Sequence, residues 1–334
     1  FIEGPFRPPP HERRPPGIYI VKRPPRPEGQ EESRLDQIVR AVEPDYETVR
    51  AMLDALKRRF PHARLGVCGR SLGGRSIYTL SIGPQENPVL YTGGFHGQEW
   101  LTPLLLLRFF ERTATAVWEG DDFSAIPIQD ALHGRGMMIV PCVNPDGIQI
   151  ALRGAQGAGP YEALATQISG GDFSRWNANA RGVDINHNFD AGWETLHQME
   201  RESGITGPAP RQYGGPAPES EPETQALVRL CRSHPFRHAL AFHSQGEEIF
   251  WEYGEHTPQR GRMMAKIFAA SSGYRLVEND GLASHGGFKD WFLSEFERPG
   301  FTFEIGRGEN PLPLSSFERI YEKLEETLLL AALM

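Results

Sequence analysis

Apolar and polar positions along the chain follow two periods, one typical of helices and one typical of strands. Asp45 precedes apolar residues spaced three and four apart as far as Phe60, which predicts a capped helix with one buried face. Residues 101–110 are almost wholly apolar and predict a buried helix that continues to about residue 118. Further helices are expected at residues 219–233, 258–271 and 315–328.

Short apolar runs bounded by Gly, Pro and Asn predict the strands. These runs lie at residues 65–68, 77–82, 88–92, 137–143, 239–242, 249–253 and 301–305. We expect the first three to form a β-meander, and 249–253 to be the hairpin neighbour of 239–242. Because helices and strands mix along the whole chain, the predicted fold class is α/β with a mixed sheet.

Composition narrows the class of protein. The 334 residues carry a net charge of −8, and no basic stripe is evident beyond residue 26, which argues against nucleic acid as the main partner. No apolar run approaches the roughly 18 residues of a membrane span. Residues 1–43 are rich in Pro and Arg and predict an N-terminal arm or linker, which leaves residues 44–334 as the folded domain.

The three cysteines, Cys68, Cys142 and Cys231, are far apart and odd in number. They predict buried free thiols, and neither a disulfide framework nor a Cys-rich zinc site. This pattern fits a reducing compartment. No signal peptide is visible, so we expect a cytoplasmic or wall-associated protein, with the cytoplasm favoured.

Polar side chains that can bind metal stand where predicted strands end. His96 and Glu99 follow the strand at 88–92, His243 follows 239–242, and Glu304 closes the strand that begins at Phe301. Each residue has an ordinary alternative: Glu99 can favour a helix dipole, His243 can be a core histidine, and Glu304 can pair with a nearby arginine. Such groups are costly to bury unless they are paired or bound to metal, so the coincidence favours a metal site.

The chemistry of that site follows from its donors. His96, Glu99 and His243 would bind one zinc ion and leave a position for water, whose pKa zinc lowers toward about 7. Glu304 is then the spare carboxylate, able to take a proton from water and give it to a leaving amine. Asp184 is either a partner that orients a ligand histidine or an ordinary turn aspartate.

The ordered motifs resemble those of the zinc carboxypeptidases of the carboxypeptidase A superfamily. They are His-x-x-Glu at 96–99, Asn-Pro-Asp-Gly at 144–147, Gly-Val-Asp-x-Asn at 182–186, His-Ser at 243–244 and Phe-Thr-Phe-Glu at 301–304. The resemblance covers residues 44–334. It implies a single α/β/α domain with a central mixed sheet, zinc ligands at His96, Glu99 and His243, and a general base and acid at Glu304.

Three positions depart from the family pattern, and one of them is the family tyrosine after Asp-Trp, since Asp290-Trp291 is followed here by Phe292. The family has Asn-Arg where this chain has Asn186-His187, and a neutral histidine cannot grip a C-terminal carboxylate with two parallel bonds. The arginine that supports the oxyanion in the family falls near Arg175, at a position that aligns with Asn177. The resemblance therefore implies zinc hydrolysis but leaves recognition of a C-terminus in question.

Three further stretches, 242–248, 286–292 and 304–311, look like the bacterial γ-D-glutamyl-L-diamino-acid endopeptidase I branch. That branch implies hydrolysis of the γ-D-glutamyl–diaminopimelate bond, with a peptidoglycan-derived peptide as substrate. Charged and polar residues expected to contact this substrate, each of which can equally be an ordinary surface group, are Asn186, His187, Arg307, Lys289, Glu247 and Arg181.

Two other functions stay open. One is a metallocarboxypeptidase for ordinary peptides, whose carboxylate grip comes from Arg153 or Arg181. The other is a non-catalytic wall-binding protein on a retired peptidase fold. Loss of a ligand or of the base would indicate retirement, and all four residues are present.

Overall fold

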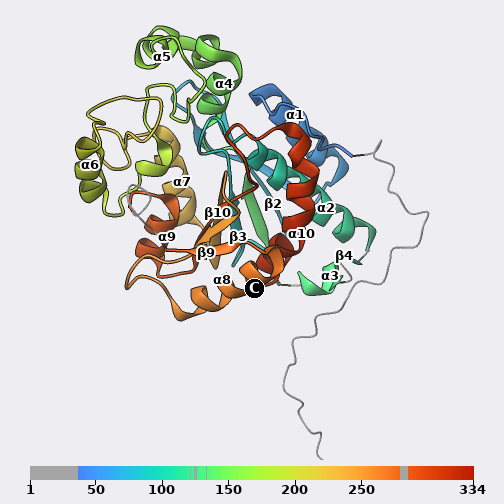
Figure 1. The fold of residues 1–334 in the computed structure, drawn as a ribbon. Helices are drawn as coiled ribbons and strands as arrows, with labels where there is room; N and C mark the ends of the chain where they lie inside the picture. Colours follow the sequence, from blue (N-terminus) through green and yellow to red (C-terminus); the bar gives the residue numbers. More distant parts are fainter. Residues whose placement is uncertain (1–36, 121, 124–125, 133, 279–284) are drawn as a thin grey trace, which may run out of the picture. The chain divides into compact units, whose positions relative to one another are not determined.

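The computed structural model describes residues 37–334 except 121, 124–125, 133 and 279–284 (Figure 1). Of the predicted arm at 1–43, residues 1–36 therefore lie outside the described residues, and residues 37–43 are described. Its last residues pack on helix α2 (Leu101–Glu119), where the backbone N–H groups of Ile38 and Val39 donate to the Glu111 carboxylate at 2.8 and 3.0 Å.

A mixed sheet forms the centre of the described chain, as predicted. It has eight strands in the order β1-β2-β6-β3-β7-β10-β8-β9 in the part of the chain that the structure describes. The strands are β1 (Arg64–Arg70), β2 (Ser76–Ile82), β3 (Val89–Thr92), β6 (Met137–Val140), β7 (His238–His243), β8 (Glu248–Phe250), β9 (Arg275–Val277) and β10 (Gly300–Glu304). The four central strands β6, β3, β7 and β10 are parallel, so their carboxyl ends lie at one edge.

Helices cover both faces of the sheet (Figure 1). Alternate side chains of a strand point to opposite faces, so Tyr91 and Leu90 of β3 belong to different clusters of the core. The Tyr91 face packs against α1 (Tyr46–Arg59), α2, α8 (Gln259–Ser272) and α10 (Phe317–Leu333). The Leu90 face packs against α7 (Pro222–Ser233) and α9 (Phe288–Phe296).

Two of the predicted strand pairings are wrong. β1 and β2 form the expected antiparallel pair, but β6 lies between β2 and β3, so the three strands are not a meander. β8 pairs with β10 and not with β7. The reason is that both edges of β7 are already occupied, by β3 on one side and β10 on the other.

The remaining elements lie in the connections. They are β4 (Asp122–Phe123), β5 (Ile126–Pro127), α3 (Ile128–Ala131), α4 (Pro145–Arg153), η2 (Gly154–Tyr161), α5 (Glu162–Ser169), η3 (Ile185–His187), α6 (Trp193–Glu202) and η5 (Leu314–Ser316). Within the described residues, no helix combines the length and the apolar character needed to cross a membrane.

Candidate metal centre

The parallel centre of the sheet brings the predicted ligands together. His243 is the last residue of β7 and pairs in register with Glu304, the last residue of β10. β3 runs parallel to β7 on its other side and leads directly into the turn that carries His96 and Glu99. Because these strands end at one edge, three segments far apart in sequence converge there.

Glycines let the turn after β3 lie against neighbouring backbone. Gly94 has a φ of +63°, and a Cβ there would approach the Cα of Cys142 within 2.9 Å. A Cβ on Gly97 would lie 2.4 Å from the carbonyl oxygen of Gly147 and 2.5 Å from that of Trp176. Only glycine fits at both places, and the close approach places His96 and Glu99 at the sheet edge.

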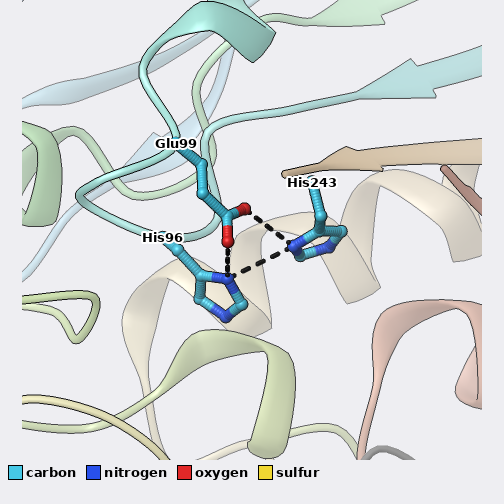
Figure 2. A group of neighbouring side chains, drawn as sticks. All are labelled: His96, Glu99 and His243. Carbon is cyan, nitrogen blue, oxygen red and sulfur yellow. Dashed lines mark hydrogen bonds and ion pairs between the residues drawn. The ribbon is translucent and has the colours of Figure 1, made fainter. Parts of the chain in front are cut away.

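Figure 2 shows the Glu99 carboxylate facing both histidine rings. Its two oxygens lie 2.9 Å from His96 Nδ1 and 3.1 Å from His243 Nδ1, and the two Nδ1 atoms are 3.3 Å apart. Zinc bonds of 2.0–2.1 Å in a tetrahedron separate neighbouring ligand atoms by about 3.3 Å. The donor types and their spacing therefore fit a zinc ion held by two Nδ1 atoms and one carboxylate.

Buried neighbours hold the ligand rings in place. Asp184 is 3% exposed, and its Oδ1 lies 2.9 Å from His96 Nε2, on the side of the ring opposite Glu99. In the neutral ring, a proton on Nε2 shared with Asp184 would leave Nδ1 available to a metal ion. Phe95 stacks on His243 with ring centroids 4.9 Å apart and fixes the orientation of that ring.

Without metal, opposite charges dominate the electrostatics of the cluster. Burial lowers the pKa of His96, but the carboxylates of Glu99 and Asp184 outweigh it and raise that pKa well above its usual value. Burial raises the pKa of Glu99, but the two histidines outweigh it and lower that pKa to about 2. The cluster therefore favours an ionised carboxylate, the form that binds a cation.

Glu304 differs from Glu99 although it lies beside it. Burial raises its pKa well above the usual value, and the negative charge of Glu99 adds to this effect. Its side chain is partly exposed at the end of β10, where it lines a cavity with His96 and His243. A carboxyl group of raised pKa can hold a proton near neutral pH.

The cavity at the site has a volume of about 150 Å³. Three of the predicted substrate contacts, Asn186, His187 and Lys289, line it. Lys289 is 4% exposed, and its Nζ donates to the carbonyl of Glu252 at 2.6 Å and pairs with Asp290. The cavity therefore offers two of the three predicted metal ligands, His96 and His243, together with the Glu304 carboxyl group and a buried ammonium group, to one bound molecule.

Other predicted contacts lie outside the lining of this cavity. Arg181 binds both oxygens of Glu221 at 2.7 Å. Arg307 has 74% of its side chain exposed and pairs with Glu247 at 2.8 Å. Arg153, the alternative carboxylate grip, is an exposed partner of two acidic side chains near α1.

Asn177, at the position that aligns with the oxyanion arginine, accepts a hydrogen bond from the backbone of Gln98. It lies behind the turn that carries His96, and it does not line the cavity.

Sequence reasoning missed several residues of the cavity. Thr302 lies two positions before Glu304 on β10, and the alternation of side chains along a strand could have placed it on the same face. Phe250 is its register partner on β8. His285 and Asp290 reach the cavity only because α9 packs on the sheet, and no local signal in the sequence indicates this.

Comparison with known proteins agrees with this geometry. The family model for zinc carboxypeptidases matches residues 49–328. "Gamma-D-glutamyl-L-diamino acid endopeptidase 1" of Lysinibacillus sphaericus is 33% identical over 281 residues, which are 84% of this chain and 69% of the relative. Human carboxypeptidase B is 27% identical over 89% of this chain and 72% of its own length.

Among solved structures, carboxypeptidase A from Helicoverpa armigera covers 88% of this chain and 74% of its own, with a TM-score of 0.66 and 20% identity. That likeness supports the fold. The family match over residues 49–328 and the converging His-Glu-His group lead to one conclusion: the chain belongs to the zinc carboxypeptidase family and is a zinc metallopeptidase.

Proposed function

We propose that this metallopeptidase hydrolyses the γ-D-glutamyl–diaminopimelate amide bond of peptidoglycan peptides. The observation that carries the proposal is a cavity that joins the metal ligands and Glu304 to a buried lysine and a histidine. A substrate rich in carboxylates suits these basic side chains. The likeness to a relative named as a γ-D-glutamyl-L-diamino acid endopeptidase supports the same substrate class.

The zinc ion and the protein side chains have separate roles in the proposed reaction. A zinc ion held by His96, Glu99 and His243 would activate water and polarise the scissile carbonyl. Glu304 accepts the proton of the attacking water and passes it to the nitrogen of the leaving diamino acid. Its raised pKa suits this role, since the group must hold the proton between the two steps.

Recognition falls first to the residues that line the cavity. Lys289 and His187 contact substrate carboxylates in this proposal, and Asn186, whose Oδ1 accepts from the backbone of Phe288 at 3.0 Å, holds the wall between them. Glu247, Arg307 and Arg181 do not line the cavity, so in this proposal they contact only those parts of a longer substrate that extend beyond it.

The proposal is tested with L-Ala-γ-D-Glu-meso-diaminopimelate and mass spectrometry. Wild type should release L-Ala-D-Glu, and Glu304→Gln should keep one zinc per chain while losing hydrolysis. The matched control is Glu309→Gln, an exposed carboxylate five residues further on, which should behave as wild type.

Two outcomes would replace the proposal. Removal of C-terminal residues from ordinary peptides, with the tripeptide left intact, would make the protein a carboxypeptidase. Full zinc content without hydrolysis of either substrate would favour a non-catalytic wall-binding protein.

A further inference from the structure

A second carboxylate is buried behind the cavity wall. Glu200 lies on α6, is 0% exposed, and accepts three hydrogen bonds. His187 Nδ1 lies 2.9 Å from its Oε1, while His197 Nδ1 and the backbone N–H of Gly214 lie 3.0 and 3.2 Å from its Oε2. A buried carboxylate is costly unless it is paired, and within the described residues the two histidines are its only ion-pair partners.

The contacts of His187 define which ring nitrogen carries hydrogen. Its Nδ1 faces two acceptors, the Glu200 carboxylate and the carbonyl oxygen of Gln212 at 3.2 Å, so Nδ1 is a donor. Among the described residues, the hydrogen bonds of the His187 ring all involve Nδ1, and none involves Nε2. Because the ring lines the cavity beside His96 and Glu304, Nε2 is the atom available to a bound molecule.

Charges on both sides of His187 favour its imidazolium form. Burial lowers its pKa, but Asp184 and Glu200 outweigh burial and raise that pKa, while the positive charge of His96 opposes them. His197 faces the far oxygen of Glu200 and stacks on Trp193 with centroids 4.5 Å apart. The stacking holds the His197 ring in place, and the His197 ring in turn holds the Glu200 carboxylate on the side away from His187.

We propose that Glu200 is a positioning residue that presents His187 as a cationic donor, with Nδ1–H toward Glu200 and Nε2–H toward a carboxylate of the bound diamino acid. The inference rests on the proposed function, because that substrate supplies the carboxylate. A single charge-assisted hydrogen bond from Nε2 would take the place of a two-bond grip by arginine.

Glu200→Gln isolates the charge from the shape. The amide oxygen can still accept from His187 Nδ1, so the ring keeps its place while the negative charge is lost. The amide NH₂ would face His197, whose ring can accept in its other tautomer, and the backbone N–H of Gly214, which loses its acceptor at this site. Glu194→Gln is the matched control, since Glu194 is an exposed residue on the same helix.

The first measurement compares steady-state kinetics on the tripeptide and on its two mono-amides, in which one or the other diaminopimelate carboxylate is a carboxamide. We expect Glu200→Gln to raise KM for the tripeptide about tenfold to a hundredfold, the usual range for loss of a hydrogen bond to a charged group. The kcat and zinc content should stay within twofold of wild type. For the mono-amide that lacks the carboxylate bound by His187, KM should be the same for Glu200→Gln and wild type.

The second measurement follows the ring nitrogens of His187 by NMR against pH, with the signal assigned by its absence in His187→Gln. Glu200→Gln should lower the pKa of His187, and KM should begin to rise at a correspondingly lower pH. A purely structural role would not move this titration.

Several results would overturn the inference. One is the same His187 titration in wild type and Glu200→Gln, and another is an equal loss on the tripeptide and both mono-amides. If Glu200→Gln does not fold, His187→Gln is measured in its place. A KM for the tripeptide equal to that of wild type would then refute the inference that His187 binds a substrate carboxylate.

The two proposals can fail separately. If wild type leaves the tripeptide intact, the proposed function fails. The His187 titration, together with KM for an ordinary peptide and its C-terminal amide, then decides the inference about Glu200.

Discussion

Replacing Asp184 with asparagine should weaken zinc binding although Asp184 is not a ligand. Its Oδ1 lies 2.9 Å from His96 Nε2 and 3.1 Å from the backbone nitrogen of Asn186, and its Oδ2 lies 2.9 Å from that of Gln212. When His96 offers Nδ1 to the metal, all three of these partners are donors. The carboxylate meets them with two acceptor oxygens.

Asparagine has one acceptor oxygen and an NH₂ group, so it cannot satisfy all three donors. If its oxygen stays on His96, the NH₂ faces the N–H of Gln212. If the amide flips, the NH₂ faces His96 Nε2 and favours the tautomer with hydrogen on Nδ1, the atom that must bind zinc. Changes of this kind beside a ligand histidine typically cost 10- to 100-fold in metal affinity, or about 1.4–2.7 kcal/mol.

Zinc affinity is measured by competition with a chromophoric chelator, and folding of each metal-free variant is checked by urea denaturation. Asp190→Asn, an exposed aspartate six residues further on, is the matched control and should bind zinc as wild type does. A folded Asp184→Asn protein with a zinc Kd within twofold of wild type would refute this account of the His96–Asp184 contact.

Three further predictions concern pH, metal and recognition. Burial raises the pKa of Glu223 to about 8, with the charge of Asp146 adding to it, so the stability that this group contributes is complete below pH 4.5 and lost as pH rises to 8. Urea denaturation between pH 5 and 8 should show wild type losing about 1.4 kcal/mol per pH unit relative to Glu223→Gln, and parallel curves would contradict this. Zinc at a thousand times its Kd should stabilise wild type by about 4 kcal/mol over the chelated protein, whereas His243→Ala should show no such gain in a thermal melt. Lys289→Met should raise KM for the tripeptide at least tenfold, because Lys289 lines the cavity. Arg307→Ala should change KM less than threefold, because the Arg307 side chain is exposed. A larger effect on KM from Arg307→Ala than from Lys289→Met would place substrate recognition outside the cavity.

Sequence patterns determined the elements and the kind of chemistry. The apolar run from residue 101 predicted a helix to about 118, and the helix ends at Glu119. The positions of His96, His243 and Glu304 after apolar strands predicted that they would meet. The prediction was possible because strand ends in an open α/β sheet share one edge, so position along a strand already implies position in space.

Tertiary structure alone decided which segments are neighbours. β6 lies between β2 and β3, and β8 pairs with β10, because strand order depends on which edges other strands have already taken. Glu200 reaches His187 only because α6 packs behind the cavity wall, and nothing in the local sequence connects the two. Periodicity reports which face of an element a residue occupies. The partner across that face is selected by the packing of the whole domain.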